Sequence, residues 1–436
     1  MAKLVHIRKY SDSWGIRRAE IDLLGIKIRF PYGNWKAYLQ KRKQRRREKR
    51  KKRFEKKTAA FRAANHAYIT HKKDCTIRRL FITTGNLQLL NALAIILQLA
   101  EEETVPSENH VMVWSYITND EFEKTSREIA SLCGVRHYYS ICGEKYDADR
   151  VIKFIDKQKL VQIDEVYSLR LVFSTTIFEK LYRNAKYILM DEGGVSLVPI
   201  PVKIPRYCEK MISTFFLNKL DYVSFPGRPW AVEHIQQKYF SIIAHKCAAL
   251  YPWKIPHFDS QKKYVIFCGY YTAFFSPYTE DEMESRQNHI IQALNDRGFH
   301  VLYKPHPRDP VKRENHDGLT ILHTRLPLEC YQLDEIYAVI SLCSAASTQS
   351  YHYSKVAGFI DPIFCSKAYA PHLAILMNEY TPPIDLLLEV DARGKEPTEL
   401  HREIERRYEM YMADKPLLSQ NEKFNSVYHP LLKNTK

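Results

Sequence analysis

Short apolar segments alternate with helical segments from about residue 76, and this alternation constrains the fold more than any other feature of the 436-residue chain. The pattern opens with a strand at 79–83, a helix at 87–100, a strand at 110–116 and a helix at 121–133. Further strands are expected near 136–141, 164–168, 186–190 and 221–225. Such alternation is typical of a mostly parallel sheet with helices on both faces.

A second series of the same kind follows, with strands expected at 264–268, 299–303, 335–342 and 356–360 and a helix at 280–297. The length and the two series predict an α/β protein of two doubly wound, Rossmann-like domains that face a cleft. Pro226, Pro229 and the aromatic stretch 251–258 are interpreted as an interdomain linker. The expected divisions are an extension (1–75), a first domain (76–250), a linker (251–262), a second domain (263–390) and a tail (391–436). A helix at 396–413 of the tail is expected to pack back across the domains.

The basic charge of the chain is concentrated in one segment. The formal net charge is +16, and residues 41–57 hold 13 Lys or Arg against Glu48 and Glu55. We interpret this run as a solvated basic helix that follows an amphipathic leader, residues 1–40. Such runs bind anionic partners, and each basic residue near a lipid surface contributes roughly 1 kcal/mol. An anionic membrane surface is the favoured partner, while a nucleic acid and a merely solvated linker remain open.

The cysteines and the apolar runs indicate the compartment. The nine cysteines form no Cys-x-x-Cys pair and have no zinc-ligand spacing, which indicates reduced thiols in a cytosolic protein. No N-terminal apolar segment with a cleavage site is present, and no apolar run is long enough to span a bilayer.

The segment Lys304-Pro305-His306-Pro307 ends the predicted strand 299–303. Each proline fixes its own φ and moves the residue before it out of the α region, so the imidazole leaves the strand in a nearly fixed direction. Ligands of open α/β sheets bind just beyond the carboxyl ends of such strands. His306 is therefore the leading candidate for an active-site group, and a rigid turn with an exposed histidine is the alternative.

Two adjacent carboxylates, Asp191 and Glu192, follow the predicted strand 186–190 and precede Gly193 and Gly194. Neighbouring carboxylates that face a cleft raise each other's pKa, so that one can act as a general base near neutral pH. The glycines allow the backbone to approach a ligand closely. A turn with solvated acids is the alternative.

Two strand–turn–helix junctions carry small polar residues. Ser344, Ser347 and Thr348 follow one strand and are candidates for a phosphate site at a helix start, with ordinary helix capping as the alternative. Gly85, Asn86 and Gln88 hold the equivalent place in the first domain, where the two amides could bind a sugar or the carboxylate of a donor.

Signals for a metal or a dinucleotide are weak. Neither Gly-x-Gly-x-x-Gly nor a P-loop is present, and Asp147-Ala148-Asp149 follows a polar segment and is interpreted as a helix start. We therefore expect neither a metal nor a cofactor in the reaction.

Three short motifs follow strand ends in the order acid–acid–Gly, His–Pro and a Ser/Thr pair. This combination resembles that of the bacterial sialyltransferases, above all the capsule polysialyltransferases and the lipooligosaccharide sialyltransferases. The segment 83–93 also resembles their first strand–helix unit, with Gly85-Asn86 in place of the usual Ser/Thr-Pro. The resemblance covers roughly residues 76–375 and implies a GT-B fold.

The resemblance also implies roles for single residues. Glu192 would be the general base, with Asp191 as the second choice, and His306 would meet the phosphate of CMP and assist its departure. Ser347 and Thr348 fit the Ser/Thr motif better than Ser344 does. The expected donor-binding residues are Lys304, Pro307, Ser344, Ser347, Thr348 and Gly269, and the expected acceptor- or sugar-binding residues are Gly85, Asn86, Gln88 and Gly193.

The implied reaction is inverting, metal-independent transfer of sialic acid from CMP-sialic acid to a capsule or lipooligosaccharide glycan. A histidine and hydroxyls can stabilise a departing phosphate monoester, and a carboxylate can deprotonate the acceptor on the opposite face. In this interpretation the leader and the basic helix hold a cytoplasmic enzyme at the inner membrane.

Three other interpretations remain open. The chain could be another GT-B enzyme of surface-polysaccharide synthesis with a different donor, or a sugar-binding homologue without activity. It could also bind nucleic acid through residues 41–57, although the α/β region contains no recognisable nucleic-acid module and none is expected as a partner.

Overall fold

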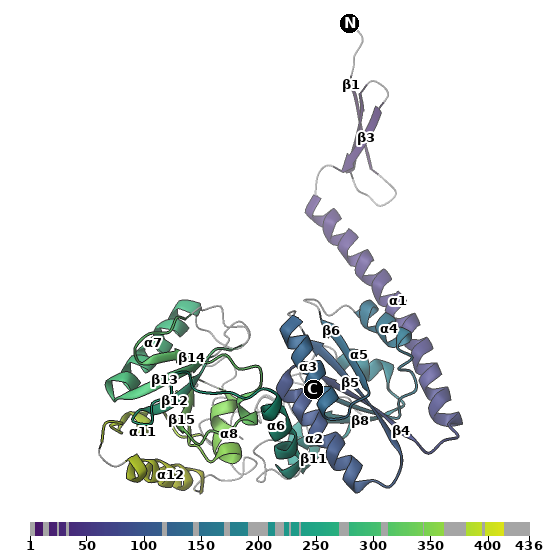
Figure 1. Cartoon of the computed structure of the whole chain (residues 1–436). Helices are drawn as coiled ribbons and strands as arrows, with labels where there is room; N and C mark the ends of the chain where they lie inside the picture. The colour runs from purple at the N-terminus through teal and green to yellow at the C-terminus, as the bar shows by residue number, and fades with distance from the viewer. Residues whose placement is uncertain are drawn as a thin grey trace.

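The structure is a computed structural model of the whole chain (Figure 1). It describes residues 5–11, 17–23, 26–31, 35–115, 120–142, 148–169, 175–190, 208–213, 222–225, 228–234, 237–269, 279–306, 313–342, 344–361, 381–394 and 397–413.

The N-terminal extension begins with strands and continues as a helix. β1 (Val5–Ser11), β2 (Arg17–Leu23) and β3 (Ile26–Pro31) form an antiparallel sheet, and α1 (Trp35–His71) follows. The helix expected at 41–57 is confirmed within α1, and the amphipathic leader contains three strands that were not predicted. The reason is visible in 26–30, where apolar and basic residues alternate with the period of two that is typical of a strand.

The first domain is built on a sheet of order β10-β11-β9-β8-β7-β4-β5-β6, parallel except between β10 and β11. Its strands are β4 (Ile77–Thr83), β5 (Ser107–Ser115), β6 (His137–Cys142), β7 (Glu165–Leu169), β8 (Lys186–Met190), β9 (Cys208–Ser213), β10 (Tyr222–Phe225) and β11 (Arg228–His234). Its helices are α2 (Asn86–Glu102), α3 (Asp120–Leu132), α4 (Ala148–Lys157), α5 (Thr175–Leu181) and α6 (Gln237–Leu250). The start of α4 confirms that Asp147-Ala148-Asp149 leads into a helix.

The second domain has a parallel sheet of order β14-β13-β12-β15-β16. The strands are β12 (Lys263–Cys268), β13 (Phe299–Lys304), β14 (Leu319–Ile321), β15 (Ile336–Ser341) and β16 (Gly358–Ile360). The helical segments are α7 (Glu280–Asp296), η2 (Leu328–Cys330), α8 (Ala345–Ser354), α11 (Asp385–Leu388) and α12 (Pro397–Ala413). Two Rossmann-like sheets in series confirm the expected α/β, GT-B type architecture.

Two details differ from the sequence-based expectations. Pro229 lies inside β11, opposite Ser224 of the antiparallel partner β10, and so is part of the sheet and not of a linker. α12 packs on the second domain and not across both, since Tyr408 is buried in that domain's core and its ring lies 4.7 Å from the ring of Tyr351.

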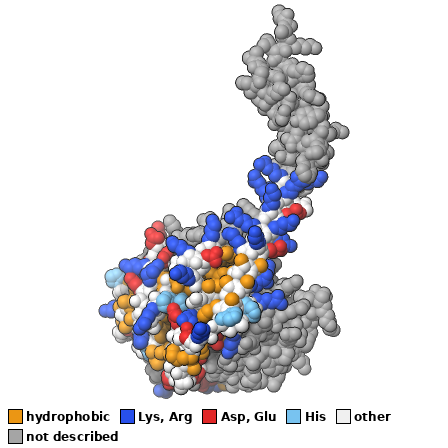
Figure 2. Space-filling model, turned by 90° about the vertical axis from the view of Figure 1, so that its right-hand side faces the viewer, with side chains coloured by type: hydrophobic (Ala, Val, Ile, Leu, Met, Phe, Trp, Pro, Cys, Tyr) orange, Lys and Arg blue, Asp and Glu red, His pale blue; other side chains and the backbone are white. Residues whose placement is uncertain are grey.

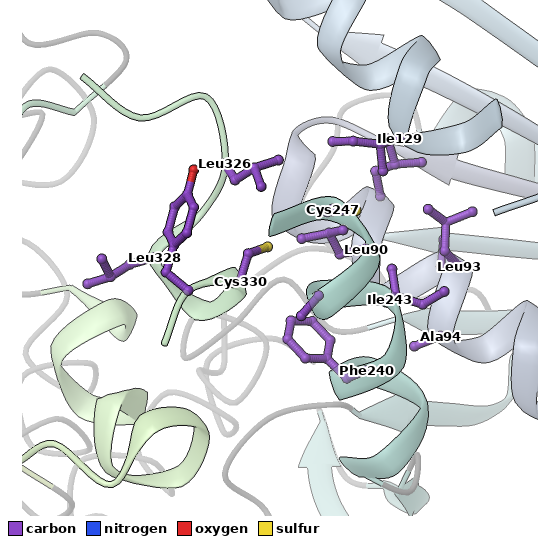
Figure 3. Close-up of a cluster of buried hydrophobic side chains, with 14 of the residues drawn as sticks. Leu90, Leu93, Ala94, Ile129, Phe240, Ile243, Cys247, Leu326, Leu328 and Cys330 are labelled. Carbon is purple, nitrogen blue, oxygen red and sulfur yellow. The ribbon is translucent and has the colours of Figure 1, made fainter. Parts of the chain in front are cut away.

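One cluster of buried hydrophobic side chains contains residues of both domains (Figure 3). Leu90 and Leu93 of α2 pack with Ile243 of α6, and Leu328 and Cys330 of η2 approach from the second domain. The stretch predicted to be a linker takes part in the packing: Ile255 is buried, and the ring of Trp253 lies 5.6 Å from that of Tyr331. The C-terminal edge of the first sheet is thereby held next to the second domain. The described thiols Cys75, Cys133, Cys247, Cys268 and Cys330 are free, as expected.

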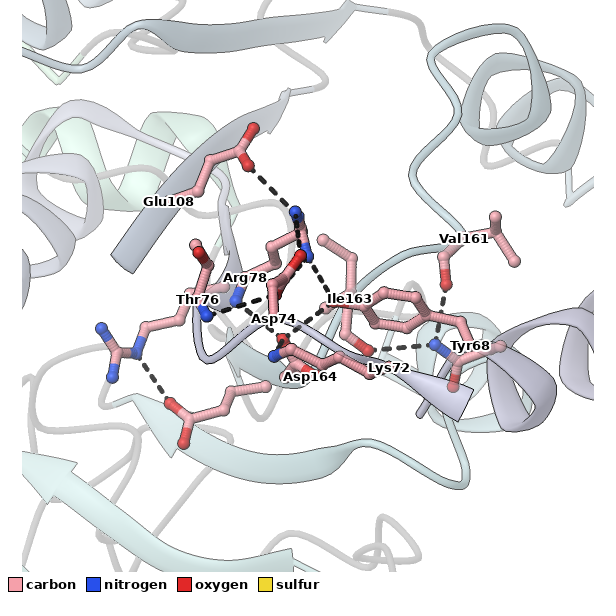
Figure 4. A network of polar contacts seen from close by, with 12 residues as sticks. Tyr68, Lys72, Asp74, Thr76, Arg78, Glu108, Val161, Ile163 and Asp164 are labelled. Atoms are coloured by element: carbon pink, nitrogen blue, oxygen red, sulfur yellow. Dashed lines mark hydrogen bonds and ion pairs between the residues drawn. The ribbon is translucent and has the colours of Figure 1, made fainter. Parts of the chain in front are cut away.

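The second half of α1 is fastened to the first domain, whereas its basic half projects from it (Figure 1). Phe61 is buried edge-on against Tyr182, and Asn65 Nδ2 donates to the carbonyl oxygens of Val161 and Ile163 at 2.8 and 3.0 Å. Figure 4 shows the polar network at the end of the helix, in which Lys72 Nζ lies 2.7 Å from Asp164 Oδ2. None of the helices in the described part of the chain is long and apolar enough to cross a membrane.

Candidate functional site

The end of β13 presents Lys304 and His306, both half-buried. The amide of Gly269, the first residue after β12, donates to the carbonyl oxygen of Lys304 at 2.8 Å. Two of the expected donor-binding residues are thus joined, and His306 follows two residues beyond the junction. Pro307, the second proline of the motif, lies outside the described residues.

Burial and one cation set the electrostatics around this junction. Burial raises the pKa of the Cys268 thiol to about 12, and the Lys304 ammonium opposes this rise. Burial likewise raises the pKa of the Glu329 carboxyl in η2, again opposed by Lys304. The low-polarity surroundings of Lys304 strengthen its interaction with any anion that enters, because charges attract more strongly where water is excluded.

Glu329 is a buried carboxyl near this junction that the sequence analysis did not single out. It is buried within η2, and its carboxylate is close enough to Lys304 for their charges to interact. A buried carboxyl with a raised pKa makes this position a candidate for a functional role. The sequence carried one usable signal, an acidic residue within the apolar segment 326–333.

The strand–helix junction that contains Ser344 and Ser347, here called the serine junction, lies beside Lys304 and Glu329, at the carboxyl end of β15. Ser344 caps α8, accepting from the amide of Ala346 at 3.3 Å, and its own amide donates to Ser341 Oγ at 2.9 Å. Ser347 is fully buried, and its hydroxyl lies 2.7 Å from Ser341 Oγ and donates to the Ser344 carbonyl at 3.0 Å. Thr348 lies in α8, and the placement of its side chain is not described. Ser347 therefore stabilises the turn between β15 and α8 through buried hydrogen bonds, while Ser344 is half-buried at the helix start.

The first-domain junction meets the second domain directly. Gly85 caps α2 without a side-chain hydrogen bond, and Gln88 Oε1 lies 2.7 Å from the position that a Cβ atom would take there. Asn86 Oδ1 accepts from Ser126 Oγ at 2.8 Å, and Asn86 Nδ2 donates to the backbone carbonyl of Arg325 at 3.3 Å. The carboxyl end of β4 is therefore held against the segment that leads to η2 and Glu329.

A salt bridge supports the same junction from α3. Arg325 Nε lies 2.9 Å from Glu121 Oε1, and its guanidinium group lies 5.4 Å from the ring centre of Tyr251. The two domains therefore meet through polar contacts as well as through the shared core.

The position of the acidic pair, Asp191 and Glu192, is inferred from the strand that precedes it. Asp191, Glu192 and Gly193 lie outside the described residues and follow directly after β8 in the sequence. β8 is parallel to β7, which in turn pairs with β4, so these three strands end at the same edge of the first sheet. The residue that the resemblance implies as the base is therefore attached to the edge that faces the second domain.

The described groups suit a negatively charged ligand. A half-buried histidine and a lysine at one strand end, with serine hydroxyls at the neighbouring strand end, can hold a phosphate and stabilise charge that develops on it. The amides of Asn86 and Gln88 at the opposing junction can hydrogen-bond a polar ligand such as a sugar.

Solved structures with a similar arrangement have low sequence identity. A UDP-GlcNAc 2-epimerase from Neisseria meningitidis bound to UDP-GlcNAc is 12% identical with a TM-score of 0.45, covering 82% of this chain and 100% of that one. UGT89C1 from Arabidopsis thaliana complexed with UDP is 10% identical with a TM-score of 0.41, covering 82% of this chain and 100% of that one. No curated protein sequence matches significantly.

A family model gives a more specific result. The model of alpha-2,8-polysialyltransferase (POLYST) matches residues 134–360, a little over half of the chain. The match includes the acidic pair after β8, the His–Pro motif after β13 and the serine junction after β15. The chain belongs to the alpha-2,8-polysialyltransferase family and is a glycosyltransferase of GT-B type.

Proposed function

We propose that this glycosyltransferase transfers sialic acid from CMP-sialic acid to a cell-surface glycan, with inversion and without a metal at the reacting centre. The observation that carries the proposal is the contact between the two strand-end junctions, in which Asn86 donates to the Arg325 carbonyl. This contact holds the edge of the first sheet, where the acidic pair follows β8, against the segment that leads to Glu329 in the second domain.

On the donor side, His306 and Lys304 bind the phosphate of CMP and stabilise the charge that it gains on leaving. CMP departs as a phosphate monoester, so these two groups and the hydroxyl of Ser344 can supply the stabilisation that a metal gives in other transferases. The amide of Gly269 is already bonded to Lys304, so Gly269 acts by allowing the backbone to approach the nucleotide.

On the acceptor side, Glu192 removes the proton of the attacking hydroxyl, with Asp191 as the alternative base. The acceptor oxygen forms a bond to the anomeric carbon of sialic acid while the bond from that carbon to the phosphate oxygen breaks. Attack from the face opposite to the leaving group inverts the configuration. The acceptor is a capsule or lipooligosaccharide glycan, and repeated transfer would produce a polysialyl chain.

The test is the release of CMP from CMP-sialic acid by the full-length protein in the presence of a chelator, with and without glycan acceptors. Acceptor-dependent release is expected for the wild type, together with a loss of at least about 100-fold in kcat for Glu192→Gln and His306→Ala. His66→Ala, on the exposed face of α1, is the matched control and should retain full activity. A folded protein that neither binds CMP nor releases it would overturn the proposal.

A second candidate function is transfer from a different nucleotide sugar, since the GT-B architecture is compatible with many donors. The same assay with a panel of UDP-, GDP- and CMP-sugars distinguishes the two. Turnover of another donor with the same dependence on His306 would favour this alternative.

We further propose that α1 attaches the enzyme to the inner face of the membrane as a peripheral protein. Lys and Arg side chains gather along the part of α1 that leaves the domain (Figure 2), and the described side chains of 40–53 are exposed. The helix lies outside the site, so its charge is available to an anionic surface.

Vesicle flotation tests this attachment. The wild type should float with vesicles of about 30% phosphatidylserine and not with purely zwitterionic ones, and replacing Lys41, Arg42, Lys43, Arg45, Arg46 and Lys49 by Gln should abolish flotation. CMP release on a soluble acceptor should be unchanged in this variant. Equal flotation of the wild type and the variant would exclude α1 as the attachment site, and tight salt-dependent binding of a DNA duplex without flotation would favour nucleic acid instead.

A further inference from the structure

A group of three potential metal ligands lies at the amino ends of β5 and β6, at the opposite end of the strands from the proposed catalytic site. Glu108 and His110 are two residues apart on β5, so their side chains point to the same face of the sheet. His137, the first residue of β6, is paired in register with His110. Among the described residues, this is the only group of three His, Cys, Asp or Glu side chains arranged closely enough to hold an ion.

The donor atoms of the three residues converge. Glu108 Oε1 lies 3.2 Å from His110 Nε2 and 3.0 Å from His137 Nε2, and all three donor atoms lie within 4.8 Å of one another. Tetrahedral Zn²⁺ with bonds of about 2.0–2.2 Å places neighbouring ligand atoms about 3.3–3.5 Å apart. The two measured separations are therefore within a few tenths of an ångström of those in a zinc site.

Outer contacts orient two of the three ligands. Arg78 Nε binds the other carboxylate oxygen of Glu108, Oε2, at 3.2 Å (Figure 4), which leaves Oε1 directed at the histidines. His110 Nδ1 lies 3.2 Å from the Tyr139 hydroxyl, an acceptor that would fix the tautomer with Nε2 available to a metal. Such contacts are what metal-binding imidazoles and carboxylates have in known sites. The charge of Arg78 is itself offset by Asp74, 3.1 Å away.

The group is partly accessible from solvent. The His110 side chain is 10% exposed, whereas those of Glu108 and His137 are 34% and 41% exposed. An ion could therefore enter past His137, and a water molecule could complete a tetrahedral set of ligands.

We propose that Glu108, His110 and His137 bind a Zn²⁺ ion that has a structural role. β6 is the last described strand at its edge of the sheet, and the ion would join it to β5 across the directly paired histidines. Imidazole and carboxylate donors suit zinc, whereas Mg²⁺ prefers oxygen ligands alone. The site lies apart from the strand ends to which the reaction is assigned, so the proposal is independent of the identity of the donor.

The test uses the full-length protein, freed of metal with a chelator and titrated with Zn²⁺ in competition with a chromophoric chelator. One tightly bound equivalent is expected, with a rise of the thermal midpoint by about 5 °C or more at saturation, since a ligand that binds only the folded state stabilises it. Mg²⁺ at the same concentration should leave the midpoint unchanged. Co²⁺ in place of zinc should give no thiolate charge-transfer band, because no cysteine takes part.

Variants assign the ion to this group. His137→Gln and Glu108→Gln, both on partly exposed side chains, should keep the metal-free midpoint close to that of the wild type and lose the zinc-dependent rise. Tyr139→Phe should weaken zinc binding by about tenfold, because it removes only the outer contact of His110. His300→Gln, on β13, is the matched control and should bind zinc as the wild type does. Absence of stoichiometric binding by the folded wild type, or unchanged binding in both Gln variants, would overturn the proposal.

Discussion

The amide nitrogen of Gly269 donates to the carbonyl oxygen of Lys304 over 2.8 Å, so the ends of β12 and β13 are hydrogen-bonded to each other at the point where both strands give way to loops. His306 follows this bond by two residues, within a segment in which Pro305 limits the backbone. The direction of the imidazole is therefore determined by the sheet as well as by the loop. This explains how a short motif can hold the imidazole that we propose as a catalytic group in a reproducible direction.

The packing of α8 on β16 leads to a stability prediction for Gly358. A Cβ atom at Gly358 would lie 1.6 Å from the backbone oxygen of Ser347, so Gly358→Ala forces the helix backbone away from the strand. We expect a loss of about 3 kcal/mol or more in the free energy of unfolding, at the upper end of overpacking effects, as measured by urea denaturation.

Gly134→Ala is the matched control for this substitution. Gly134 has φ +76°, and no atom lies within 4 Å of the place that a methyl group would take, so Ala there meets backbone strain alone. This strain should cost about 1–2 kcal/mol. Equal losses for the two variants would show that α8 and β16 are not in close contact.

Ser347 and Ser344 should differ in what they contribute. Ser347→Ala removes two hydrogen bonds inside the protein and leaves Ser341 Oγ with one partner fewer, so the protein should lose about 1–3 kcal/mol of stability. Ser344→Ala should lower donor affinity more than stability, because its hydroxyl lies at the helix start and its capping bond to the Ala346 amide is long, at 3.3 Å.

The measurements that check this difference are thermal unfolding and the KM for CMP-sialic acid of each variant. A larger rise in KM for Ser347→Ala than for Ser344→Ala would contradict the assignment of Ser347 to the interior.

Much of the sheet architecture could be predicted because the strands of both domains are buried apolar runs. The strand expected at 186–190 is observed as β8, and the strand at 299–303 is extended by one residue in β13. The strands β9 and β11 were not predicted. Their segments, 208–213 and 228–234, contain charged residues and a proline, which interrupt the apolar run expected of a buried strand. β14 has only three residues, too few for a periodic pattern.

The candidate site was predicted in part, since a motif identifies residues and not their partners. His306, Lys304 and Gly269 could be proposed from strand ends, but the contact between Asn86 and Arg325 joins residues 239 positions apart. Glu329 was missed for a similar reason: the apolar segment 326–333 around it is a weak local signal, and its burial arises from long-range packing.

The attachment of α1 should depend on Asn65. Its side chain is fully buried and donates to two carbonyl groups of the segment that precedes β7. Asn65→Ala would leave both acceptors without this partner and should cost about 1–3 kcal/mol. Hydrogen exchange should accelerate in the second half of α1 in this variant and stay unchanged in α7, whereas His66→Ala should alter neither.

Glu329 predicts a specific dependence of stability on pH. Burial raises the pKa of its carboxyl in the folded state above the ordinary value near 4.5, so the folded protein binds more protons than the unfolded chain between these two pKa values. The contribution of Glu329 to stability is therefore fully present below the ordinary pKa and falls as the pH rises through the folded-state pKa. Glu329→Gln keeps the shape of the protonated side chain and cannot ionise, so it removes this loss.

We accordingly expect Glu329→Gln to unfold at nearly the same temperature as the wild type near pH 4 and at a higher temperature at about pH 7.5. The measurement is the difference between the two thermal midpoints across this range, with Glu335→Gln, an exposed residue just before β15, as the control. A constant difference would show that Glu329 is ionised in the folded protein with an ordinary pKa. A difference that turns against the variant as the pH rises would show that attraction to Lys304 outweighs the cost of burying the carboxylate, and Glu329 would then be a charged partner of the lysine at the proposed phosphate site.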